Sequence, residues 1–108
     1  MRDCLIVETR DPLEIGDVEW VADLLVQLGQ AGVRCAIMLT ENGVLGVRAS
    51  ARTTFPRRLI DNSVAVLADR FALAERGMKE AELVPGVACA DLGAVVDALE
   101  AGASVIWR

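Results

Sequence analysis

The side chains that could do chemistry in this chain of 108 residues are few, and histidine is not among them. Without histidine, neither a Ser-His-Asp triad nor a Cys-His pair activates a nucleophile, and no histidine-ligated metal site forms. Nucleophilic chemistry is therefore left to three cysteines, Cys4, Cys35 and Cys89. Their odd number and wide spacing predict free thiols rather than a disulfide framework or a zinc site.

The three thiols differ in their sequence surroundings. Cys4 and Cys35 lie inside apolar runs, where a buried thiol behaves as a small, inert hydrophobic side chain. Cys89 lies near the end of a short apolar run, just before an expected helix whose N-terminus favours a thiolate. The neighbouring carboxylate of Asp91 opposes that effect, and a purely structural role for Cys89 stays open. Cys89 is nevertheless the best reactive thiol in the sequence.

Carboxylates follow the ends of apolar runs. Glu8 and Asp11 follow the first run, and Asp69 follows the third. Paired acids with a central aspartate are typical of magnesium-binding receiver domains, but that layout needs a lysine after the last strand, and the only lysine is Lys79. The simpler interpretation of Asp69 is a helix N-cap. Glycine-rich phosphate-binding loops are also missing, so we expect neither a metal nor a cofactor.

Charge is unevenly distributed along a chain whose net charge is −5. The segment 42–60 carries basic residues and no acid, whereas the segments on either side are acidic. This basic segment is either a solvated surface that pairs with acids elsewhere, or an anion site or docking surface for an acidic partner. The overall acidity argues against binding of nucleic acid. The basic residues are Arg48, Arg52, Arg57 and Arg58.

The elements that position these residues follow from hydrophobic periodicity. Apolar types make up 54% of the residues with only two Trp and two Phe, which predicts one domain, 1–108, with an aliphatic core. One helix starts after Asp91, with Leu92, Val95, Val96 and Leu99 expected on one apolar face. Strands are predicted at 4–7, 33–39, 64–68, 87–90 and 104–107, and the other helices at 18–28, 55–60 and 70–76.

Alternation of strands and helices favours a parallel sheet covered on both faces. We therefore expect the α/β class, as a three-layer α/β/α sandwich with a five-stranded parallel sheet. In such sheets ligands bind beyond the carboxyl ends of the strands. The segments 8–17, 40–48, 69–71 and 90–92 are the loops expected at that edge.

Nothing in the sequence predicts a membrane segment or a secretory leader. No apolar run approaches the roughly 18 residues that cross a bilayer. The first residues place an acid early and then only a short apolar run, unlike a signal peptide. We therefore expect a cytoplasmic location and no contact with a membrane.

Three local patterns, in order along the chain, resemble one family. The first is a strand, a loop with proline and a long helix over residues 5–28. The second is Glu41-Asn42-Gly43-Val44, which is similar to the family's turn after its second strand. The third is VAVLA followed by residues 69–78, similar to the family's strand, catalytic-site turn and helix ending in Arg-Gly. With a final strand at 105–107, the chain resembles the DsrE/DsrF-like family, which includes the TusD, TusC and TusB sulfur-relay subunits.

The resemblance implies a parallel α/β/α fold, assembly into dimers, trimers or hexamers, and a persulfide-carrying cysteine at the end of the third strand. In that family the cysteine precedes the Arg-Gly pair by seven residues. Here the pair is Arg76-Gly77, so the corresponding position is Asp69. Aspartate holds no persulfide. The resemblance therefore implies a non-catalytic binding or partner subunit of a sulfur-transfer system.

The site that the resemblance implies is a pocket between the loops 8–17, 40–48 and 69–77. Arg70 and Arg76 are expected to hold an anionic group by charge-assisted hydrogen bonds, and the mixture of acids and bases favours a polar or zwitterionic ligand. The expected ligand-binding residues are Pro12, Asn42, Gly43, Val44, Asp69, Arg70, Arg76 and Gly77.

Two other functions stay open at this point. The chain is either an active sulfur carrier with Cys89 as its thiolate nucleophile, or an unrelated small α/β interaction module. For partners, we expect a homo-oligomer, trimer or hexamer, or a complex with paralogous subunits, together with a sulfur-donor or sulfur-acceptor protein. The aliphatic content, with a mean hydropathy of +0.41, is higher than so small a core is expected to bury, which favours an oligomer. Trp20, Phe55 and Trp107 are candidate interface anchors, with the core as their alternative place.

Overall fold

The structure, a computed structural model, describes residues 3–108 and contains within them one five-stranded sheet. Residues 1 and 2 lie outside the described residues. The predicted domain 1–108 includes them, and so does the N-terminal segment that was expected not to be a signal peptide. Every pair of neighbouring strands is parallel, as predicted. The strands are β1 (Cys4–Glu8), β2 (Cys35–Leu39), β3 (Ala65–Asp69), β4 (Ala88–Ala90) and β5 (Ser104–Trp107).

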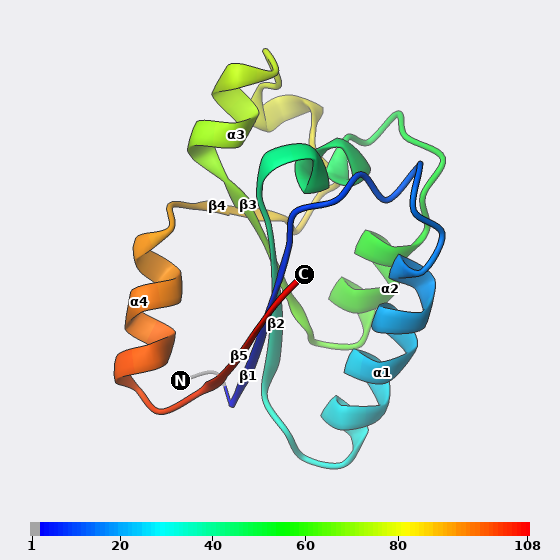
Figure 1. Cartoon of the computed structure of the whole chain (residues 1–108). Helices are drawn as coiled ribbons and strands as arrows, with labels where there is room; N and C mark the ends of the chain where they lie inside the picture. Colours follow the sequence, from blue (N-terminus) through cyan, green and yellow to red (C-terminus); the bar gives the residue numbers. More distant parts are fainter. Residues whose placement is uncertain (1–2) are drawn as a thin grey trace.

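The predicted three-layer sandwich is confirmed by the arrangement of the helices (Figure 1). Helices α1 and α2 pack on one face of the sheet, and α4 packs on the other. Helix α3 lies beyond the carboxyl end of β3. The helices are α1 (Val18–Gln30), α2 (Phe55–Asp61), α3 (Arg70–Glu75) and α4 (Gly93–Glu100), with 3-10 turns η1 (Glu41–Val47) and η2 (Glu80–Glu82).

The strand order β4-β3-β2-β1-β5 explains why the two faces are covered by different parts of the chain. From β1 to β4, each new strand adds to the same side of the sheet. Right-handed crossovers between these strands therefore place α1 and α2 on the same face. The connection from β4 to β5 runs back across the whole sheet. The same handedness then places α4 on the opposite face. Among the described residues, α4 is thus the helix that covers this second face.

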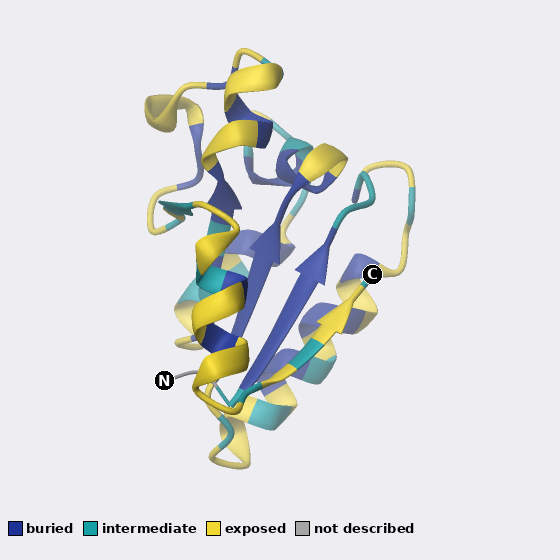
Figure 2. Cartoon of the chain, turned by 60° about the vertical axis from the view of Figure 1, so that its left-hand side comes forward, coloured by how far each residue is buried: buried dark blue, intermediate teal, exposed yellow. Residues whose placement is uncertain are grey.

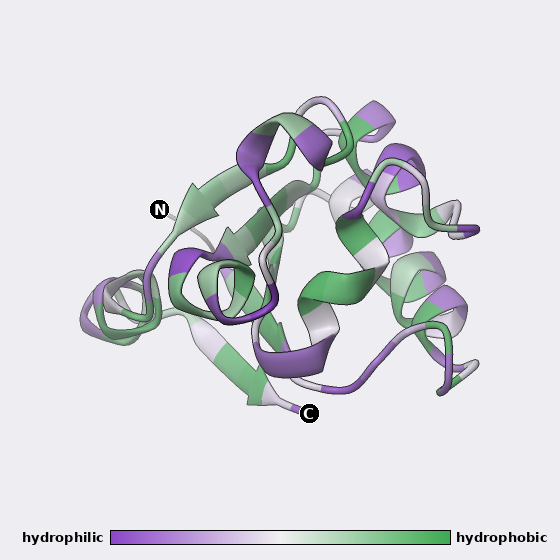
Figure 3. Cartoon of the chain, turned by 90° about the horizontal axis from the view of Figure 1, so that it is seen from above, coloured by the Kyte–Doolittle hydropathy of each residue, from purple (hydrophilic) through white to green (hydrophobic). Residues whose placement is uncertain are grey.

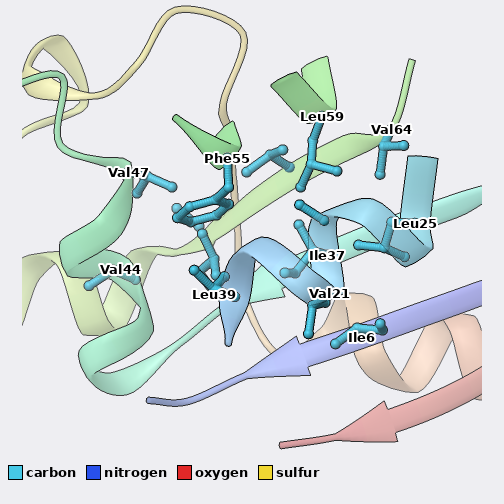
Figure 4. Packing of buried hydrophobic residues seen from close by; sticks show 14 of the residues in the cluster. Ile6, Val21, Leu25, Ile37, Leu39, Val44, Val47, Phe55, Leu59 and Val64 are labelled. Atoms are coloured by element: carbon cyan, nitrogen blue, oxygen red, sulfur yellow. The ribbon is translucent and has the colours of Figure 1, made fainter. Parts of the chain in front are cut away.

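The larger core lies between the sheet and the pair α1 and α2 (Figure 4). β1 and β2 are continuous apolar runs because they are central strands that are buried on both faces. Phe55, a candidate interface anchor in the sequence, is fully buried here and is a core residue. Core side chains labelled in the figure include Ile6, Val21, Leu25, Ile37, Leu39, Val44 and Leu59.

The smaller core beneath α4 corrects the predicted orientation of that helix. Only Val95 of the predicted apolar face is buried, whereas Leu92, Val96 and Leu99 are 44%, 53% and 58% exposed. The helix instead turns its small residues toward the sheet, with Ala98 buried beside Val95, and alanine lets a helix approach a strand closely. Figure 2 shows the exposed outer side of α4 next to the exposed strand β5.

All strands end at one edge, so the loops that follow them gather there. Seen from above, this carboxyl edge carries many hydrophilic segments over an apolar sheet (Figure 3). Within residues 3–108, no helix has the length and apolar character that crossing a membrane requires.

Candidate functional site

A cavity of about 400 Å³ opens at the carboxyl edge of the sheet, on the side covered by α4. Its walls come from the ends of β2, β3 and β5, from α3, and from the residue that precedes α4. Segments that are far apart in the sequence thus meet here because parallel strands end at the same edge. The lining residues are Thr40, Glu41, Asp69, Phe71, Ala72, Glu75, Leu92 and Trp107.

Asp69 forms the buried floor of this cavity, with only 3% of its surface exposed. One carboxylate oxygen, Oδ1, accepts a hydrogen bond from the backbone N–H of Phe71 at 3.2 Å, which confirms the predicted cap of α3. The other oxygen, Oδ2, accepts a bond from the hydroxyl of Thr40 at 2.7 Å. Thr40 directly follows β2, and β2 and β3 are neighbours in register, so the two side chains meet.

Apolar and aromatic side chains form the outer wall of the cavity. Phe71 and Trp107 line it although 69% and 56% of their surfaces are exposed, and Leu92 lines it from the start of α4. Sequence reasoning treated Trp107 as an interface anchor and missed it as a site residue. Its position at the carboxyl end of the last predicted strand was the signal that could have placed it at this edge.

No arginine or lysine lines the cavity within the described residues, contrary to the anion-binding role expected for Arg76. The guanidinium of Arg76 donates to the side-chain oxygen of Asn42 through Nη2 at 2.9 Å and through Nε at 3.2 Å. It also donates to the carbonyl of Ala72 at 3.1 Å and lies 3.7 Å from the carboxylate of Glu75. Asn42 and Arg76 therefore tie η1 to α3 and leave the cavity acidic.

Four of the expected ligand-binding residues have packing roles in the structure. Val44 is fully buried in the core, and Pro12 packs against Gly46. A Cβ on Gly43 would lie 2.3 Å from the carbonyl oxygen of Glu8, so only glycine fits between η1 and the end of β1. Gly77 follows α3 with φ of +63°, a conformation that glycine adopts without strain.

Cys89 lies in a different, smaller cavity of about 220 Å³ that also contains Arg70. It pairs in register with Ala68, whereas Asp69 is one residue further along β3, so Cys89 and Asp69 point to opposite faces of the sheet. Burial raises the pKa of the Cys89 thiol, and the nearby carboxylate of Glu80 raises it further against the opposing effect of Arg70. Asp69 and Arg70, which were expected in one pocket with loop 8–17, thus line two different cavities, and no residue of loop 8–17 lines either of them.

Glu8, the last residue of β1, and Asp17, the residue before α1, pair with arginines. The buried carboxylate of Glu8 lies 3.3 Å from Nε of Arg10 and 3.6 Å from Nη1 of Arg108. Both arginines also bind Asp17. Within residues 3–108, no group of three or more Cys, Asp or Glu side chains could hold a metal ion. This arrangement holds the end of β1 against β5 by ion pairs.

The arginines of the basic segment 42–60 lie at or near the surface, which fits both of its interpretations. Arg58 pairs with Asp23 of α1, while Arg52 and Arg57 are exposed. Arg48 is partly buried and its Nε lacks a hydrogen-bond partner. None of the four arginines lines the cavity around Asp69.

Three solved structures share the fold of this chain over nearly their whole lengths. The ychN protein from E. coli superposes with a TM-score of 0.83 at 17% identity, covering 100% of both chains. The fold is the same in all three. A protein of unknown function from Methanobacterium thermoautotrophicum matches with a TM-score of 0.82 at 19% identity, over 99% of this chain and 98% of that one.

The third structure is a conserved protein of unknown function from Bacteroides thetaiotaomicron, with a TM-score of 0.79 at 14% identity over 98% of this chain and 95% of that one. No protein-family model matches the chain, and no curated protein matches it. At these identities the structural matches establish the fold of a small α/β module and leave its activity to be argued from the site.

Proposed function

We propose that this chain is a non-catalytic binding or partner subunit of a cytoplasmic sulfur-transfer system of the DsrE/DsrF-like kind. The order of the three sequence patterns and the five-stranded parallel fold support this proposal. The observation that carries it is Asp69 at the end of β3. That is the position at which the resemblance implies a persulfide cysteine, and it lines the cavity of about 400 Å³ at the carboxyl edge.

The chemistry of this edge favours recognition over sulfur transfer. A carboxylate carries no sulfur, and both oxygens of Asp69 already accept hydrogen bonds that hold the site together. None of the three cysteines lines the cavity. Cys4 and Cys35 are buried in the core, and the raised pKa of Cys89 leaves little thiolate near neutral pH.

The partners that fit this role are further copies of the chain, paralogous subunits, and a protein that donates or accepts sulfur. Exposed apolar side chains around the cavity support a docking role at the carboxyl edge. Leu92, Phe71 and Trp107 all stand partly in solvent there. Apolar side chains gathered on one surface favour contact with another protein.

The test is exposure of the protein to a small persulfide donor, followed by alkylation and mass spectrometry of each cysteine peptide. We expect the wild-type chain to take up no sulfur atom on Cys89. The variant Asp69→Cys places a thiol at the implied position and is expected to gain one sulfur atom on that residue. Cys89→Ser in both backgrounds is the matched control, since it removes the competing thiol.

The outcomes separate the competing functions. A sulfur adduct on Cys89 of the wild-type protein would favour the active carrier and overturn the non-catalytic role. An Asp69→Cys variant that folds but never takes up sulfur would show that this edge is not of the sulfur-relay kind. The unrelated interaction module would then be the better description.

A further inference from the structure

We propose that the cavity around Asp69 binds an organic cation, a protonated or quaternary amine that carries an apolar body. This inference names the class of ligand for the binding role proposed above, and rests on that role. It replaces the expectation of a polar or zwitterionic ligand, whose anionic group was to be held by Arg70 and Arg76, neither of which lines this cavity.

The first argument is charge. Three carboxylates line the cavity, from Glu41, Asp69 and Glu75, and no Arg or Lys in the described part of the chain lines it. Asp69 is nearly inaccessible, and the hydrogen-bond donors to its carboxylate among residues 3–108 are neutral, namely the hydroxyl of Thr40 and the backbone N–H of Phe71. Each carboxylate oxygen has two acceptor positions, so capacity remains for a donor on a ligand. A cation in the cavity would complement a carboxylate that the fold itself leaves without a positive partner.

The second argument is the wall of aromatic rings. Phe71 and Trp107 line the same cavity, and both keep more than half of their surface exposed. The faces of aromatic rings attract cations, most strongly in the case of tryptophan. Leu92 and Ala72 add apolar surface that would cover the organic part of the ligand. The carboxylates would attract the charge of an amine, and the aromatic and apolar side chains would contact its organic part. The two features together favour an amine with an apolar body over a ligand that has only one of these properties.

Size and spacing distinguish an organic cation from a metal ion. The volume of about 400 Å³ falls within the range of small-molecule sites. The carboxylates surround this space but do not converge, since no metal-binding cluster of three such side chains exists in residues 3–108. An anionic ligand would meet repulsion from the carboxylates of Asp69 and Glu41, whereas Arg76, 3.7 Å from the carboxylate of Glu75, offsets part of the charge of that residue alone.

The experiment uses Trp107 as the reporter. The variant Trp20→Phe removes the other indole, which is exposed on α1 beside a separate small cavity. We expect the fluorescence of Trp107 to change saturably on titration with benzyltrimethylammonium. Benzyl alcohol, which has the same ring without the charge, should bind at least about tenfold more weakly, and phenylacetate should not bind. Added salt should weaken the cation's binding.

Variants in the Trp20→Phe background assign the binding to this cavity. Asp69→Asn keeps an oxygen that caps α3 and turns its amide N–H toward the hydroxyl oxygen of Thr40, which accepts, but it loses the charge and should weaken benzyltrimethylammonium binding about tenfold. The matched control is Asp11→Asn, because Asp11 accepts from the backbone N–H of Leu13 at 2.9 Å in the same way but lies outside the cavity. Phe71→Leu keeps the apolar bulk and should weaken binding by a smaller factor, since the ring face is lost.

Several results would overturn the inference. They are equal binding of the charged and neutral probes, an Asp69→Asn variant with unchanged affinity, saturable binding of magnesium chloride in place of the amine, or no binding of any probe. None of these depends on the sulfur assay. A chain that takes up no sulfur yet binds no amine would keep its proposed place in sulfur transfer while losing this ligand.

Discussion

At the scale of single residues, Asp69 links three parts of the fold as well as forming the floor of the cavity. It joins the end of β3, the first turn of α3 and Thr40 after β2. Removing one partner of a buried hydrogen bond leaves the other partner without compensation, which costs more than the bond itself contributes. The residue therefore affects stability and ligand binding together, and variants must separate the two.

Asp69→Ala is expected to lower the free energy of unfolding by roughly 1–3 kcal/mol, because it removes a helix cap and leaves the hydroxyl of Thr40 unpaired. Asp69→Asn should cost less, about 1 kcal/mol or below, since the amide oxygen still accepts a hydrogen bond and asparagine is a good N-cap. Urea unfolding followed by circular dichroism measures both. Asp11→Ala is the control, because its hydrogen bond to Leu13 is exposed. Equal losses for Asp69→Ala and Asp69→Asn would contradict this account.

At the scale of elements, the two central strands carry buried thiols beside each other. Cys4 on β1 and Cys35 on β2 are partners in register, and both are buried. Burial raises the pKa of the Cys4 thiol and of the Cys35 thiol, and each remains protonated in the folded state to a higher pH than in the unfolded chain. The inert role predicted for both agrees with this environment.

These raised pKa values predict a fall in stability at alkaline pH. Above the usual thiol pKa of about 8.5, the unfolded chain releases protons that the folded chain retains, so the free energy of unfolding decreases as the pH rises. The contribution is fully present below that pKa. Urea unfolding at a series of pH values measures the slope, which should flatten in a Cys4→Ala, Cys35→Ala double variant. Cys89→Ala, which changes a half-buried thiol, should flatten it less; an unchanged slope in the double variant would exclude this cause.

The sequence predicted which elements form better than which way they face. The five strands and four helices follow from apolar runs, from the Asp69 cap and from Gly77. Periodicity could not orient α4, because its large and small apolar residues are interleaved and the sheet accepts the alanine side. The sequence predicted only a loop at 40–48, where the structure has the 3-10 helix η1, because this segment has no clear hydrophobic period.

The candidate site was predictable in position but not in composition. Strand ends place Asp69 at the carboxyl edge, and that follows from the sequence alone. Whether Cys89 lines the same cavity as Asp69 depends on the pairing register of β3 and β4. Cys89 pairs with Ala68 and not with Asp69, and this difference of one residue places the two side chains on opposite faces of the sheet. Arg76 does not line the cavity because its guanidinium donates a hydrogen bond to the side chain of Asn42. This contact joins residues far apart in the sequence, and no local pattern indicates it.

At the scale of the whole molecule, one outer surface is more apolar than the rest of the fold requires. We call Leu92, Val96, Leu99 and Trp107 the α4 patch, because the first three follow one another at helical spacing and Trp107 lines the same cavity as Leu92. In the part of the chain that the structure describes, α4 is the helix that packs on the second face of the sheet. An added subunit over the α4 patch would complete that layer and enclose the cavity, in keeping with the proposed role as a partner subunit.

We therefore expect light scattering to show an oligomer of the wild-type chain in solution at micromolar concentration. Leu99→Glu places a charge in the α4 patch and should shift the protein to a monomer, since burying an unpaired carboxylate in an apolar contact is costly. The matched control is Leu13→Glu, because Leu13 is 56% exposed, almost as much as Leu99, but lies outside the α4 patch. A wild-type chain that is monomeric throughout would exclude self-association and leave a paralogous subunit as the occupant. Equal dissociation by both variants would place the contact elsewhere on the surface.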